Sequence, residues 1–258
     1  MTTDVDGSGQ SSFAYRFDWG IDGLRALAPS AEFLVIVDVL RFTTAVTTAL
    51  ESGSVVLPYP WDTADAATFA ADRSAVLAGH CEVGGPSLSP TDLLTRAAGQ
   101  RIVLPSPNGA TLAFAAPRLG SARVLAGCVR NASSVANRIR AAAGGRRATV
   151  AVIASGERWG SNTGPLRPAV EDLIGAGAIL AALDPSGAIG APRCSPEARA
   201  ARAAFLDARP RLYDSLLAST SGRELAARGW DDDVATSAAH DVTNVVGELV
   251  GDTFVPMR

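Results

Sequence analysis

The sequence contains little cysteine, and its cysteines are not spaced for metal binding. Of the 258 residues only Cys81, Cys128 and Cys194 are cysteines. Their number is odd and no C-x-x-C pair is present, which argues against a thiolate zinc site of that type and favours a reducing compartment. We therefore expect a cytoplasmic location.

Long apolar runs are also missing. No segment approaches the ~18 consecutive apolar residues of a membrane span, and residues 1–12 are polar, without the apolar core of a signal peptide. We expect a soluble protein with residues 1–12 as a disordered tail. Residues 13–258 are long enough for one α/β domain or for two interleaved subdomains, 13–145 and 146–258.

An excess of positive charge is absent as well. Lys and Arg number 23 against 26 Asp and Glu, which gives a net charge of −3. A nucleic acid or an anionic membrane needs a broad basic field, so neither is an expected partner. An anionic ligand would have to be attracted by local groups or by a metal ion.

What the sequence does have is an alternation of strand and helix patterns. The apolar run at 33–39, unbroken up to the acid Asp38, is typical of a strand buried on both faces. This alternation predicts an α/β fold with a mostly parallel sheet and right-handed crossovers. Residues from about 196 to 239 are alanine-rich and predict a helical segment. The other predicted strands are 54–59, 75–79, 101–104, 123–127, 147–155 and 253–255.

Ligands of such sheets bind beyond the carboxyl ends of the strands. Asp38 ends the first clear strand, and Arg41, Thr43 and Thr44 open the following helix. A carboxylate there can bind a hard cation, and a helix start with threonine hydroxyls can bind phosphate. The alternative is that Asp38 and the threonines only cap the helix.

A second polar cluster follows the predicted strand at 101–104. Ser106, Asn108 and Gly109 offer a hydroxyl, an amide and close backbone approach, which suit a phosphate or sulfonate oxygen. The same residues also make an ordinary turn. The sequence alone does not choose between these interpretations.

Charged and amide side chains follow two later strands. Arg130 could bind an anionic oxygen with two hydrogen bonds, whereas Asn131 could equally be a helix cap. Glu157 and Arg158 follow the strand at 147–155. All four are candidates for a site at the strand ends.

Glu171 and Asp172 lie in the first turn of the helix predicted at 169–183. Acids there favour the helix dipole, or they turn into the crevice and bind metal. The loop from His80 is similar to the H-C-x5-R loop of cysteine phosphatases, but Ser87 replaces the required arginine. A cysteine nucleophile is therefore not favoured.

Taken in order, these segments resemble the 2-phosphosulfolactate phosphatase (ComB) family. Residues 35–44 are similar to its I-D-V-L-R-A-S-T-T element, residues 107–111 to its T-N-G-T, and residues 131–132 to its Asn-Ala pair. Further similar elements lie at 154–156, 170–172, 176–178, 232–234 and 255–256.

The resemblance implies a three-layer α/β/α fold with a mostly parallel sheet and a helical C-terminal segment. It also implies Mg²⁺-dependent hydrolysis of 2-phospho-3-sulfolactate to 3-sulfolactate and phosphate, a step of coenzyme M biosynthesis. The 80–90 loop departs from the family, and only Glu82 and Ser89-Pro90 plainly match. Two alternatives therefore stay open: another small phosphorylated hydroxy acid as substrate, or a non-catalytic anion-binding protein.

The expected site follows from the motifs and the resemblance together. Asp38 would hold Mg²⁺ with Glu171 or Asp172, with Glu82 and Glu157 as weaker candidates, and Arg41 would act on the phosphoryl group. A homodimer is one possible assembly. The residues expected to bind the substrate are Thr43, Thr44, Ser89, Ser106, Asn108, Gly109, Arg130, Asn131 and Arg158.

Overall fold

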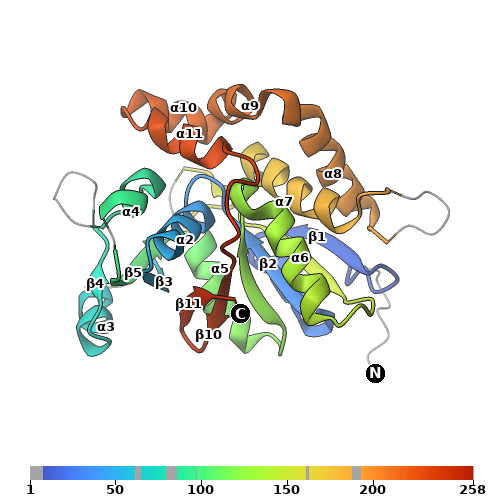
Figure 1. Cartoon of the computed structure of the whole chain (residues 1–258), viewed down its shortest axis with the longest axis horizontal. Coiled ribbons are helices and arrows are strands. Elements are labelled where there is room, and N and C mark those ends of the chain that lie inside the picture. The colour runs from blue at the N-terminus through green and yellow to red at the C-terminus, as the bar shows by residue number, and fades with distance from the viewer. Residues whose placement is uncertain are drawn as a thin grey trace.

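The computed structural model describes residues 8–61, 65–79, 86–96, 98–160, 163–187 and 193–257 (Figure 1). Strands and helices of the described residues mostly alternate up to residue 183, as predicted from residue 33 onward, and four helices and the strands β10 and β11 follow. The elements are β1 (Tyr15–Trp19), α1 (Gly20–Leu27), β2 (Phe33–Val37), α2 (Phe42–Glu51), β3 (Val55–Pro60), α3 (Ala66–Asp72), β4 (Val76–Leu77), α4 (Pro90–Arg96), β5 (Arg101–Ser106), α5 (Gly109–Ala115), β6 (Arg123–Gly127), α6 (Ala132–Ala142), β7 (Val150–Ala154), β8 (Glu157–Arg158), β9 (Leu166–Arg167), α7 (Val170–Leu183), α8 (Pro196–Ala208), α9 (Leu212–Ala218), α10 (Thr220–Ala227), α11 (Asp231–Ala238), β10 (Gly247–Val250) and β11 (Thr253–Pro256).

Within the described residues nine strands form one sheet in the order β1-β7-β2-β6-β10-β11-β3-β5-β4. It consists of two parallel blocks, β1-β7-β2-β6 and β3-β5-β4. The antiparallel hairpin β10–β11 lies between them. The mostly parallel sheet is thus confirmed. Strand β7 pairs with both β1 and β2, so the two ranges considered as subdomains, 13–145 and 146–258, share this sheet.

The three layers follow from strands that are apolar on both faces. In β2, Val35 and Val37 pack into a core with α6, α7 and α8. Leu34 and Ile36 point the other way, into a core with α1, α2 and α5. Because side chains alternate along a strand, an unbroken apolar run buries both faces. The predicted three-layer α/β/α fold is confirmed.

The helical segment after residue 196 has two roles. Helix α8 packs closely on α7, and a Cβ on Gly177 would lie only 2.0 Å from the carbonyl oxygen of Ala201. Helices α9, α10 and α11 continue over the end of the sheet (Figure 1). The segment is therefore partly a layer of the domain and partly a cover over the strand ends.

The expected N-terminal tail is described only from Ser8 onward. Gln10 donates a side-chain hydrogen bond to the carbonyl of Phe17 at 2.9 Å, and Arg16 donates to the carbonyl of Gly9 at 3.2 Å. The described part of the tail is therefore bonded to β1. None of the helices among the described residues combines the length and apolarity needed to cross a membrane.

Candidate active site

Asp38 follows β2 and is the centre of the candidate site. The residue is only 5% exposed. Oδ1 accepts a hydrogen bond from the N–H of Phe42 at 3.0 Å, and Oδ2 accepts one from the N–H of Gly109 at 2.9 Å. The two clusters expected from the sequence therefore meet. A Cβ at residue 109 would lie 2.7 Å from Oδ2, so this approach requires glycine.

The environment of Asp38 disfavours its charged form. Burial raises the pKa of its carboxyl to about 6, and the charges of Glu157 and Glu171 add to the rise. The N–H groups of Phe42 and Gly109 lower the pKa but do not offset the burial. The carboxylate is thus held in a place where a nearby cation would be favourable.

Asp172 ties together the ends of two strands. Its Oδ1 accepts from the N–H of Val39 and its Oδ2 from the N–H of Gly156, both at 2.8 Å. Burial, followed by the charges of Asp38 and Glu171, raises its pKa well above the ordinary value. Glu171 is buried beside it. The acidic pair in the first turn of α7 therefore does share the end of β2 with Asp38.

A cavity of about 190 Å³ opens beside Asp38. Side chains of Arg41, Ser106, Asn108 and Glu157 line it, together with α10 and Trp230 on the covering side. A larger cavity of about 800 Å³, which we call the outer cavity, shares several lining residues with it. The residues that line the outer cavity include Pro107, Glu157, Arg158, Arg167, Glu224 and Arg228. Both signs of charge therefore line these two adjoining cavities.

The oxygen ligands near Asp38 suit a magnesium ion better than a metal whose ligands are all protein side chains. Among the described residues no group of three or more Asp, Glu, His or Cys side chains is arranged to hold a metal. Mg²⁺, however, usually takes one or two carboxylates and completes its shell with water and substrate phosphate. Asp38 and Glu157 both line the cavity, and Glu157 also accepts from Asn108 Nδ2 at 2.8 Å. Glu82 lies outside the described residues.

Arg41 lines the cavity, and its side chain is held by residues of the covering helices. Its Nη1 donates to Asp233 Oδ2 at 2.7 Å, and its guanidinium carbon lies 4.5 Å from the ring centre of Trp230. The hydroxyl of Ser89 donates to Asp233 Oδ1 at 2.6 Å. Ser89, expected to bind substrate, thus binds the acid that holds Arg41.

The threonines that open α2 are turned to the backbone instead of the cavity. Both are fully buried. The hydroxyl of Thr43 donates to the carbonyl of Asp38, and that of Thr44 to the carbonyl of Val39, each at 2.8 Å. They fix the loop that carries Asp38, and the structure does not bring their hydroxyls to a substrate.

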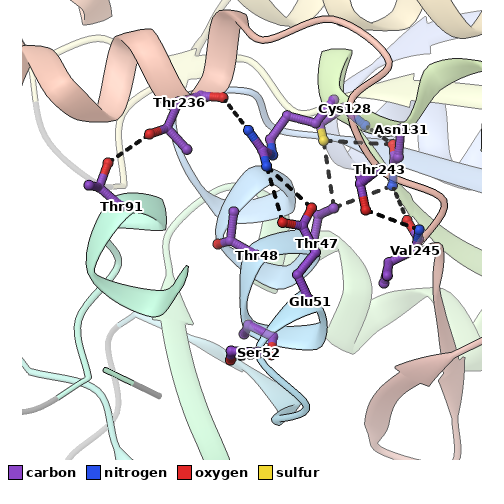
Figure 2. A network of polar contacts seen from close by, with 12 residues as sticks. Thr47, Thr48, Glu51, Ser52, Thr91, Cys128, Asn131, Thr236, Thr243 and Val245 are labelled. Atoms are coloured by element: carbon purple, nitrogen blue, oxygen red, sulfur yellow. Dashed lines mark hydrogen bonds and ion pairs between the residues drawn. The ribbon is translucent and has the colours of Figure 1, made fainter. Parts of the chain in front are cut away.

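Arg130 and Asn131 belong to a separate structural network. Arg130 donates to Glu51 Oε2 at 3.1 Å and to the carbonyl of Thr236 at 2.9 Å. Asn131 accepts from the N–H of Cys128 and donates to the carbonyl of Val245. Figure 2 shows Glu51 and Thr236 on elements that this network joins, with Cys128, Asn131 and Val245 beside them. Neither residue lines the Asp38 cavity.

Sequence reasoning missed Asp233 and Trp230. The run of acids at 231–233 is typical of a helix start, which hides the one that turns inward. The similarity of 232–234 to a family element was the signal that could have found it.

The fold is that of an α/β enzyme, and a cavity lined by charged and polar side chains lies beside the end of β2. The 2-phosphosulpholactate phosphatase family matches residues 24–252. The chain belongs to this family and is a phosphoric monoester hydrolase. No curated protein matches the chain.

Proposed function

We propose that this phosphatase uses Mg²⁺ to hydrolyse 2-phospho-3-sulfolactate to 3-sulfolactate and phosphate. One observation carries the proposal: the buried Asp38 carboxylate, fixed by the Gly109 N–H, lines the same cavity as Arg41 in a chain of this family. The cytoplasmic location, the lack of nucleic-acid and membrane partners, and a homodimer stay predictions.

Asp38 and Glu157 are the residues that would hold Mg²⁺, because both line the cavity. When bound, the ion would supply positive charge beside the phosphoryl oxygens. Glu171 adds a buried negative charge that favours a cation there. Asp172 is less suited, since it does not line this cavity and its two oxygens hold the backbone N–H groups of Val39 and Gly156.

The chain's own residues provide binding and charge stabilisation. Arg41 can bind two phosphoryl oxygens through its fork of N–H donors. The oxygen of Ser106 accepts the N–H of Asn108, which leaves its hydroxyl hydrogen for a ligand oxygen. Water attacks phosphorus in line while the bond between phosphorus and the substrate's C2 oxygen breaks. The water gives up one proton and the leaving C2 oxygen takes one up, and these donors stabilise the charge on the equatorial oxygens.

The sulfonate needs a cation other than Arg130, whose guanidinium is bonded to Glu51 and Thr236. Arg158, Arg167 and Arg228 line the outer cavity. Arg158 donates one hydrogen bond to the carbonyl of Gly164 at 3.1 Å, and its buried Nε finds no acceptor among the described residues. We assign the sulfonate to this outer cavity.

Phosphate release from 2-phospho-3-sulfolactate and from 2-phospholactate tests the proposal, each with Mg²⁺ and with EDTA. We expect a higher kcat/KM for the sulfonated ester and loss of activity in EDTA. Arg158→Gln should raise KM for the sulfonated ester more than for 2-phospholactate. Equal kcat/KM for both esters would instead support another phosphorylated hydroxy acid as substrate, and full activity in EDTA would contradict the metal assignment.

A further inference from the structure

Three consecutive acids open α11, and the third differs from the other two in its burial. Asp231 and Asp232 are exposed, whereas Asp233 is only 2% exposed. Its two oxygens accept from Arg41 and from the Ser89 hydroxyl, and the N–H of Thr91 also reaches Oδ1 at 3.3 Å. One buried carboxylate therefore joins the loop after β2, the start of α4 and the start of α11.

Arg41 is held on two sides by the start of α11. Asp233 accepts one of its N–H groups, and Trp230 lies against the face of the guanidinium. A guanidinium carries five N–H donors, so several remain for a ligand in the Asp38 cavity. A free arginine side chain would lose rotamer freedom on fixing a ligand. Here that freedom is already restricted before any ligand binds.

We propose that Asp233 is a positioning residue for phosphoryl transfer, which fixes the Arg41 guanidinium toward the Asp38 cavity without touching the substrate. This rests on the proposed function, because Arg41 is there the group that stabilises the phosphoryl oxygens. Fixed donors stabilise a transition state best when they need no reorganisation during the reaction. The start of α11 thereby becomes part of the active site.

The competing explanation is that the ion pair only fastens α11 to the domain. The same helix offers a matched comparison, because Arg130 binds both the carbonyl of Thr236 and the carboxylate of Glu51. Arg130, which lies between β6 and α6, thereby connects α11 to α2, yet neither Arg130 nor Glu51 lines the Asp38 cavity. A purely fastening role predicts similar effects from losing either carboxylate.

The experiment compares Asp233→Asn, Arg41→Gln, the double variant and Glu51→Gln. Asparagine keeps the size of Asp233 and one oxygen for Ser89, but it removes the charge that holds Arg41. We expect kcat for phosphate release from 2-phospho-3-sulfolactate with Mg²⁺ to fall about 10- to 100-fold in Asp233→Asn. The change should add nothing in the Arg41→Gln background. Glu51→Gln should lower Tm but leave kcat within twofold.

Calorimetric binding of inorganic phosphate to the same proteins gives a readout that needs no turnover. The positioning role predicts that Asp233→Asn weakens phosphate binding and that Glu51→Gln does not. It also predicts that Asp233→Asn has no effect on phosphate binding in the Arg41→Gln background. These results would support the role even if the wild type hydrolyses none of the esters. In that case the proposed function fails, whereas the positioning of Arg41 for a bound phosphate stands. If Asp233→Asn does not fold, Trp230→Leu removes the other contact of Arg41 and should show the same dependence on Arg41.

Three results would overturn the inference. One is a folded Asp233→Asn variant with wild-type kcat and phosphate affinity. Another is an effect of Asp233→Asn that adds fully to that of Arg41→Gln. The third is a wild-type protein that binds no phosphate at all.

Discussion

Replacing Asp38 by asparagine should separate stability from activity. The carboxyl titrates near pH 6 in the folded protein and at about 3.8 in an unfolded chain. The folded state therefore binds this proton more tightly, so the free energy of unfolding falls as pH rises from about 4 to 6 and stays low above. The difference amounts to about 3 kcal/mol at pH 8.

Asparagine removes this penalty but introduces another. Its amide nitrogen cannot accept a hydrogen bond, so the N–H of Phe42 or of Gly109 loses its acceptor. A buried unpaired donor costs about 1–3 kcal/mol. At pH 4 Asp38→Asn should therefore be less stable than the wild type by about that amount. At pH 8 it should be equal to it or up to about 2 kcal/mol more stable.

Urea unfolding in EDTA between pH 4 and 8 measures the free energy of unfolding of the wild type and of Asp38→Asn as a function of pH. The expected result is that they converge or cross as pH rises. Mg²⁺ should then stabilise the wild type above pH 6 but not Asp38→Asn, because a ligand stabilises only the state that binds it. The variant should also lose phosphatase activity. Curves that run parallel, or equal stabilisation of both proteins by Mg²⁺, would refute the reasoning.

Two further substitutions test the neighbourhood of the site. Gly109→Ala places a Cβ 2.6 Å from a ring carbon of Phe42 and 2.7 Å from Asp38 Oδ2. We therefore expect the free energy of unfolding to fall by about 2–4 kcal/mol and phosphatase activity to be lost, as measured by thermal unfolding and phosphate release. Unchanged stability would contradict the close contact. Arg130→Gln leaves Glu51 without its partner, so the free energy of unfolding should fall by about 1–3 kcal/mol. The kcat of the folded protein should change less than twofold. A tenfold fall in kcat would instead show that Arg130 acts on the substrate.

The meeting of Asp38 with the turn at Gly109 could be predicted because both follow strands, and strand ends gather at a crevice. The roles of Thr43 and Arg130 could not. A polar side chain after a strand serves equally well as a bond to the local backbone, a structural ion pair or a ligand. Only its partners decide, and the partners of Arg130 are about 80 and 100 residues away in the sequence.

The fold was predictable where the apolar pattern was continuous. Strand β1 was missed because Arg16 and Asp18 interrupt its pattern, although Arg16 is buried and donates to the Ser30 hydroxyl and to the carbonyl of Phe13. The hairpin β10–β11 was only half predicted, since Glu248 interrupts its first strand. That glutamate binds Arg123 of β6 through two hydrogen bonds, a contact that no local pattern contains.

The position of residues 247–256 in the middle of the sheet governs how the chain can assemble. The slot between β6 and β3 is filled by a hairpin synthesised long after both of its neighbours. A nascent chain must therefore keep two sheet edges unpaired until Pro256 has emerged from the ribosome. Such distant pairings slow folding and leave edges open to association. Removing these ten residues would split the sheet in two. By contrast, removing a strand at the edge of the sheet would only make it narrower.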